Sequence, residues 1–129
     1  MGVAPRIPGG GGAFKKAFAD LLSAERVLLW TNPSPTANWT GGTAIDVSGQ
    51  QYAAYYIFYK AYASAANTEG SGWIAVRGAK NYAAAGYEGV NRDISISGTS
   101  ITVGVPFGGT KSSNCVPYQV FGIKGTEIR

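Results

Sequence analysis

The sequence predicts an all-β protein: an antiparallel, jelly-roll-like β-sandwich of about seven strands, preceded by one short amphipathic helix. From about residue 26 onward, apolar and polar residues alternate with a period of two, which is the period of a β-strand. The 129 residues include 19 glycines and 8 tyrosines, a mixture that favours strands joined by tight turns. Only one segment has helical spacing, and the length suits a single domain.

The N-terminal part of the chain divides into an arm and a helix. Residues 1–12, MGVAPRIPGGGG, carry two prolines and a run of four glycines, which predicts a flexible arm. Residues 13–25 follow as the predicted helix, because apolar side chains recur there at helical spacing. The stripe contains Phe14, Phe18, Leu21 and Leu22. So short a helix is marginal in water, so the stripe either covers one end of its own domain or docks on another chain. The second alternative makes these residues an anchor to another protein.

Residues 26–129 form the predicted sandwich domain. Strands are expected at 27–31, 43–47, 52–61, 73–80, 92–97, 101–105 and 116–124, separated by glycine-containing turns. The clearest unit is DISISGTSITVGV, in which Ile94 and Ile96 lie on one face before a Ser-Gly-Thr turn. Ile101 and Val103 then return on one face, so this segment is a predicted hairpin.

The segment QYAAYYIFYKAYA is apolar on both faces. Alternation places Tyr55, Ile57 and Tyr59 on the face that fills the core. The opposite face receives Tyr52, Tyr56, Phe58 and Tyr62. That face requires a cover, which is a second sheet, a second copy of the chain or a ligand that stacks on aromatic rings. It is therefore the predicted oligomer face.

The residue types present do not predict an enzyme. The chain contains no histidine, which is the usual general base and metal ligand, and Cys115 is its single cysteine. Its 7 acidic residues show neither the paired arrangement of a glycosidase nor the spacing of metal ligands. We expect no catalytic residue, no metal site and no cofactor.

The charge pattern argues against nucleic acid and membrane partners. The net charge is +4, but the 11 basic residues are scattered, and Lys15-Lys16 is the only adjacent pair. No window approaches the roughly 18 apolar residues that span a bilayer, and the N-terminus lacks the apolar run of a signal peptide. We expect synthesis in a cytoplasm and no membrane insertion.

Two predicted loops carry the side chains that suit recognition of a polar ligand. Prolines at 33 and 35 stiffen the loop after the first strand, which contains Asn32, Asn38 and Trp39. A later loop contains Tyr82 and Tyr87, and aromatic side chains give large contact area at small entropic loss. These five residues are the candidate ligand contacts. The first loop either turns a corner of the sandwich or presents Trp39 to a partner.

Three motifs, in order along the chain, resemble a known group of domains. They are LLWTNPSPT at 28–36, RDISISGTSITVG at 92–104 and CVPYQVFGIKG at 115–125. Together they resemble small domains of tail-fibre and minor structural proteins of tailed phages and prophages of gut Gram-positive bacteria. The resemblance implies a β-sandwich domain of a virion, often trimeric, at a fibre tip or another part that meets the host surface. It implies no catalytic residues.

The expected function is that of a non-enzymatic virion protein. It would be held to other virion proteins by residues 1–25 and expose the sandwich, as a homotrimer, to a host-cell-surface glycan. The alternative is a capsid decoration or head-fibre protein with a purely architectural role.

Overall fold

The computed structural model describes residues 18–40, 43–62, 70–79, 81–83, 92–104 and 114–128. These residues form one helix and ten strands. The elements are α1 (Phe18–Ser23), β1 (Arg26–Thr31), β2 (Ala44–Asp46), β3 (Gln51–Tyr52), β4 (Ala54–Tyr62), β5 (Gly70–Val76), β6 (Asn81–Ala83), β7 (Arg92–Ser97), β8 (Ser100–Val103), β9 (Asn114–Ile123) and β10 (Glu127–Ile128).

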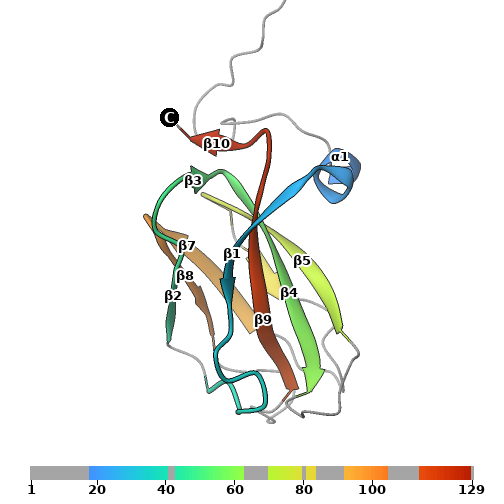
Figure 1. The fold of residues 1–129 in the computed structure, drawn as a ribbon, viewed down its shortest axis with the longest axis vertical. Coiled ribbons are helices and arrows are strands. Elements are labelled where there is room, and N and C mark those ends of the chain that lie inside the picture. The colour runs from blue at the N-terminus through green and yellow to red at the C-terminus, as the bar shows by residue number, and fades with distance from the viewer. Residues whose placement is uncertain are drawn as a thin grey trace, which may run out of the picture.

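The strands form two four-stranded sheets that lie one behind the other (Figure 1). Sheet A has the order β1-β9-β4-β5, and sheet B has the order β2-β8-β7-β6. A short pair, β10-β3, lies at the same end of the molecule as α1. All strand pairs in the described part of the chain are antiparallel, so the predicted antiparallel β class is confirmed.

The inner faces of the two sheets share one hydrophobic core. Its buried members include Tyr55, Ile57, Tyr59 and Trp73 from sheet A and Ile45, Ile94, Ile101 and Val103 from sheet B. The rings of Tyr59 and Trp73 stack with 4.1 Å between their centroids. Alternation along β4 sends Tyr55, Ile57 and Tyr59 inward, as the sequence predicts, because successive side chains of a strand point to opposite faces.

The predicted hairpin is confirmed as β7 and β8. Ser97 lies opposite Ser100, which leaves a turn of two residues between the strands. Gly98 occupies the first turn position with φ of +58°, a conformation that glycine adopts without a steric penalty. The local sequence was enough to predict this hairpin because the turn and both strands are adjacent in the chain.

The position of Tyr52 differs from the one that the sequence predicted. The expected strand over residues 52–61 is broken by a bend at Ala53, whose N–H donates to the carbonyl of Thr126 at 2.7 Å. The bend changes the alternation, so Tyr52 is buried in the core instead of sharing the outer face of β4. Its ring meets Tyr55 edge-on at 5.8 Å, and burial, helped by the charge of Glu127, raises the pKa of its phenol.

The helix α1 covers one end of the outer face of sheet A. Leu21 is buried and clusters with Ala54 of β4 and Ile123 of β9. The N–H of Lys124 donates to the carbonyl of Glu25 at 2.9 Å, which fastens the connection between α1 and β1 to the end of β9. Leu21 therefore packs on its own domain, which corrects its assignment to a virion anchor.

The other predicted anchor residues are not tested. Phe14 and the side chains of Phe18 and Leu22 lie outside the described residues. The described helix spans 6 residues, so the longer helix over 13–25 stays a prediction.

Gly122 provides a test of this packing. A Cβ atom at Gly122 would overlap the ring of Tyr52, because the ring lies directly on the β9 backbone. Gly122→Ala should lower the free energy of unfolding by about 1–3 kcal/mol, the usual effect of overpacking a core. At Gly104 the nearest atom to an added Cβ is 3.5 Å away, so Gly104→Ala is the matched control. Urea unfolding of both variants measures the difference, and equal losses would contradict the packing.

Candidate functional site

The loop after β1 is a corner fastened to β9. Asn32 is buried, and its Nδ2 donates to the carbonyl of Pro117 at 2.9 Å. Its backbone N–H donates to the carbonyl of Tyr118 at 2.8 Å. The N–H of Ser34 donates to Oδ1 of Asn32 at 2.7 Å, which closes a tight turn. Both ends of the Asn32 amide are thus engaged within the chain, and this side chain does not face a ligand.

A β-bulge in β9 lies beside this corner. Opposite β4, the register passes from Phe58↔Gln119 to Tyr59↔Pro117, which leaves Tyr118 as the extra residue. On the other side of β9, the ladder with β1 ends at the pair Thr31↔Gln119. Asn32 directly follows this pair, and its side chain and backbone N–H donate to the next two carbonyls of β9, those of Pro117 and Tyr118.

Trp39 joins the same loop to sheet B. Its Nε1 donates to the carbonyl of Val103 in β8 at 2.8 Å, and its half-buried ring meets Trp30 edge-on at 6.2 Å. The loop thus links β1 of sheet A to β8 of sheet B. This link fits the prediction that the loop turns a corner of the sandwich, and not that it presents Trp39 to a partner. Of the candidate ligand contacts, Asn38 is exposed, whereas Tyr87 and the side chain of Tyr82 lie outside the described residues.

Arg92 forms a second polar link between the sheets. Its side chain is fully buried, with Nη1 donating to the carbonyl of Gly104 at 2.8 Å and Nη2 donating to the carbonyl of Asn114 at 2.9 Å. Burial lowers the pKa of its guanidinium group. Arg92 belongs to β7 of sheet B and Asn114 to β9 of sheet A, so the planar fork of the guanidinium bridges the two sheets.

The outer face of sheet A carries the aromatic side chains that point away from the core. We call it the outer aromatic face, and it consists of Leu28, Tyr56, Phe58, Tyr118 and Phe121. The rings form two tilted pairs, Tyr56 with Phe121 at 6.1 Å and Phe58 with Tyr118 at 6.3 Å. Leu28 is 51% exposed and lies opposite Phe121. Five apolar side chains from three neighbouring strands therefore gather on this face, together with the polar Gln119, which lies opposite Phe58.

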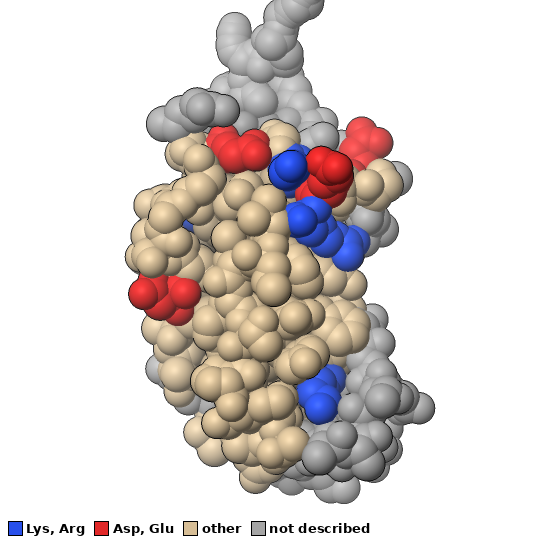
Figure 2. All heavy atoms as spheres, in the orientation of Figure 1, with Lys and Arg blue, Asp and Glu red and all other residues tan. Residues whose placement is uncertain are grey.

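A cation lies at each end of this face. The guanidinium carbon of Arg26 lies 3.6 Å from the ring centroid of Tyr56, and the ammonium nitrogen of Lys60 lies 5.6 Å from that of Tyr118. Both distances are within the range of cation–π contacts. Figure 2 shows the middle of this view without charged side chains, whereas charges of both signs gather at the α1 end.

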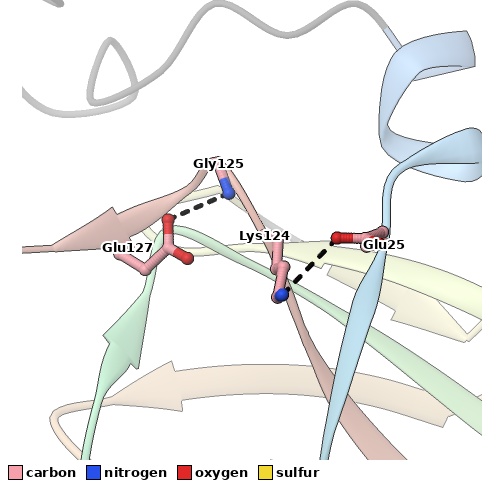
Figure 3. A network of polar contacts seen from close by, with 4 residues as sticks. All are labelled: Glu25, Lys124, Gly125 and Glu127. Atoms are coloured by element: carbon pink, nitrogen blue, oxygen red, sulfur yellow. Dashed lines mark hydrogen bonds and ion pairs between the residues drawn. The ribbon is translucent and has the colours of Figure 1, made fainter.

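The charges at the α1 end come from several elements. Glu25, which precedes β1, forms an ion pair with Lys124 at 3.4 Å, and its side chain is 81% exposed (Figure 3). Glu127 accepts a hydrogen bond from the N–H of Gly125 at 2.9 Å in the turn that leads to β10. Asp20 of α1 is also exposed. This end of the face therefore carries charges of both signs, with Arg26 and Lys124 beside Asp20 and Glu25.

The sequence identified part of this face. Tyr56 and Phe58 lie on it as predicted from the alternation of β4, and the side chain of Tyr62 lies outside the described residues. Tyr118 and Phe121 were missed. Their spacing of three residues contradicts simple alternation, and the bulge at Tyr118 is what brings them to the same face.

No other kind of site is apparent in the described part of the chain. Within it, no three His, Cys, Asp or Glu side chains gather as metal ligands would. Over the same residues, no helix has the length and apolarity needed to cross a membrane. Comparisons with protein-family models, curated proteins and solved structures found no match to this chain.

The corner at Asn32 is tested by a single-atom change. Asn32→Asp replaces the Nδ2 donor by an oxygen that cannot donate to Pro117, while the acceptor for Ser34 remains. Because a buried carbonyl loses its partner, we expect the free energy of unfolding to fall by about 1–3 kcal/mol at neutral pH. Asn38→Asp, at an exposed position of the same loop, is the control. If denaturant unfolding gives both variants the same stability, the corner does not depend on Asn32.

The bridge at Arg92 is tested by a change that keeps the charge. Arg92→Lys leaves a compact ammonium group that cannot reach both carbonyls at once, so at least one buried acceptor loses its donor. We expect a loss of about 2 kcal/mol or more in thermal or urea unfolding. Arg26→Lys, on the surface, weakens a cation–π contact with Tyr56 and should cost less than about 1 kcal/mol. Equal effects of the two changes would mean that the fork geometry of Arg92 is not needed.

Proposed function

We propose that this chain is a non-enzymatic structural protein of a tailed-phage particle, with its two sheets arranged as a jelly-roll-like β-sandwich. The proposal is carried by one observation: residues of the three motifs that resemble phage fibre domains meet at β9. Asn32 of the first motif bonds Pro117 of the third, and Arg92 of the second bonds Asn114, which directly precedes the third. The residues that carry the resemblance therefore include ones that join the two sheets.

The non-enzymatic part of the proposal is supported by where the polar side chains lie. Asn32 and Arg92 are buried polar side chains, and both donate hydrogen bonds to backbone carbonyls of β9. The buried cysteine, Cys115, has no histidine to activate it, because the chain contains none.

The proposed contact surface is the outer aromatic face. The loop over residues 32–40 is a weaker candidate for the contact surface, because the side chains of Asn32 and Trp39 are hydrogen-bonded within the fold. Attachment to other virion proteins is assigned to residues 1–25. Since Leu21 packs on Ala54 and Ile123, the anchor would use other residues of that segment.

A host-surface glycan is the candidate ligand for the outer aromatic face. It is favoured by the four half-buried aromatic rings of the outer aromatic face, since aromatic rings offer apolar area to a sugar ring. A glycan array probed with the full chain tests this candidate. Binding that Phe58→Ala abolishes would support it, and absence of binding to host-derived glycans would remove it in favour of the architectural role.

The virion assignment is tested by immunogold electron microscopy. Phage particles purified from the culture that produces this chain are labelled with an antibody raised against it. We expect label on the particle: label at the tail tip supports host contact, and label over the head supports capsid decoration. Absence of label from particles, with the chain present in the lysate, would contradict a virion protein.

A further inference from the structure

A small apolar cluster lies apart from the core between the two sheets. It contains Leu21 of α1, Ala54 of β4 and Ile123 of β9, all of them buried, and Tyr56 packs against it. No described residue of α1 belongs to the core between the sheets. Figure 1 shows α1 at one end of sheet A. The packing of one sheet on the other therefore does not depend on α1.

The place where Leu21 packs is built without α1. We call Ala54 and Ile123 the Leu21 seat. The hydroxyl of the buried Thr126 donates to the carbonyl of Ile123 at 2.7 Å and accepts from the N–H of Ala54 at 3.3 Å. The N–H of Ala53 donates to the carbonyl of Thr126 at 2.7 Å. Because none of these bonds involves α1, we expect the seat to keep its shape when Leu21 is absent.

Few contacts hold α1 on the seat. The helix spans 6 residues, which is too short for a helix to be stable by itself in water. Of its described side chains, Asp20 and Ser23 are exposed and only Leu21 is buried. After the helix, the N–H of Lys124 donates to the carbonyl of Glu25 at 2.9 Å. The side chains of these two residues form an exposed ion pair (Figure 3), a kind of contact that contributes little.

We propose that α1 is a latch, which leaves sheet A while the sandwich stays folded and so lengthens the outer aromatic face. Segments with few buried apolar contacts open locally, at a lower free energy than the whole domain. The Leu21 seat adjoins the outer aromatic face, because Tyr56 of that face packs against the same cluster. Opening therefore adds Ala54 and Ile123 to the apolar surface. The latch is a property of the isolated chain, whereas its use in contact rests on the function proposed above.

Amide hydrogen exchange of the full chain, followed by nuclear magnetic resonance, tests the latch. The reporters are the amides of Ser23 in α1 and of Lys124, which is bonded to Glu25. Both should exchange roughly a hundredfold or more faster than the amide of Ile57, because local opening requires less free energy than global unfolding. Ile57 lies in β4 between β5 and β9.

Two results of this measurement would overturn the proposal. Exchange of Lys124 at the rate of Ile57 would mean that α1 opens only when the whole sandwich unfolds. Exchange of Lys124 without any protection would mean that α1 is not docked on the sheet. A glycan array or particle labelling does not affect these rates, so failure of the latch is distinguishable from failure of the proposed function.

Leu21→Ala tests the contact that closes the latch. The change should raise the exchange rate of Lys124 by about tenfold or more, because truncating a buried leucine removes most of its packing. The amides of Ala53 and Ala54 report on the seat and should exchange as they do in the parent chain. Leu28→Ala makes the same truncation at an exposed position of β1 and is the matched control. Equal effects of the two variants on Lys124 would overturn the latch.

The lengthened face is tested with a fluorescent dye of the anilinonaphthalene sulfonate type, which binds exposed apolar surface. Leu21→Ala should increase the dye emission, whereas Leu28→Ala should not. Urea unfolding followed by tryptophan fluorescence establishes that both variants are folded, since Trp73 belongs to the core between the sheets. Unchanged dye emission of Leu21→Ala, with faster exchange of Lys124, would show that opening does not enlarge the face.

Discussion

β9 lies between β1 and β4 in sheet A, and its backbone groups must find hydrogen-bond partners away from water. The ladder with β1 ends at Gln119, and a bulge at Tyr118 interrupts the ladder with β4. Asn32, in the loop after β1, donates to the carbonyl of Pro117, and Arg92 of sheet B donates to the carbonyl of Asn114. The corner after β1 and the position of β7 therefore both depend on β9. Since an unsatisfied buried carbonyl is costly, these contacts fix how the two sheets meet.

This constraint also decides which residues remain for external contact. The distinctive polar side chains of the motifs are bonded inward, and so is the indole of Trp39. The chemistry that faces outward on sheet A is an apolar surface with a cation at each end. A surface with these side chains suits contact with another surface over a broad area. The structural role in a particle that we propose is consistent with it.

The parts of the fold that the sequence predicted depend on neighbours in the chain. The inner face of β4 and the β7–β8 hairpin follow from alternation and from one turn. The parts that it missed depend on distant residues: Tyr52 turns inward because Ala53 is bonded to Thr126, and Arg92 is buried because Asn114 accepts its hydrogen bond. Alternation cannot reveal a bulge either, so the shared face of Tyr118 and Phe121 was not foreseen. From the sequence alone, Leu21 could either pack on its own domain or dock on another chain. Its contact with Ile123 places it on its own domain.

The central claim is that the protein makes its contacts through the outer aromatic face and not through the corner after β1. Amide chemical shifts followed by nuclear magnetic resonance over a range of protein concentration test it most directly. The account predicts that concentration-dependent shifts concentrate at Arg26, Leu28, Tyr56, Phe58 and Phe121, while the signals of residues 32–39 stay constant. Shifts that concentrate in residues 32–39 would contradict it.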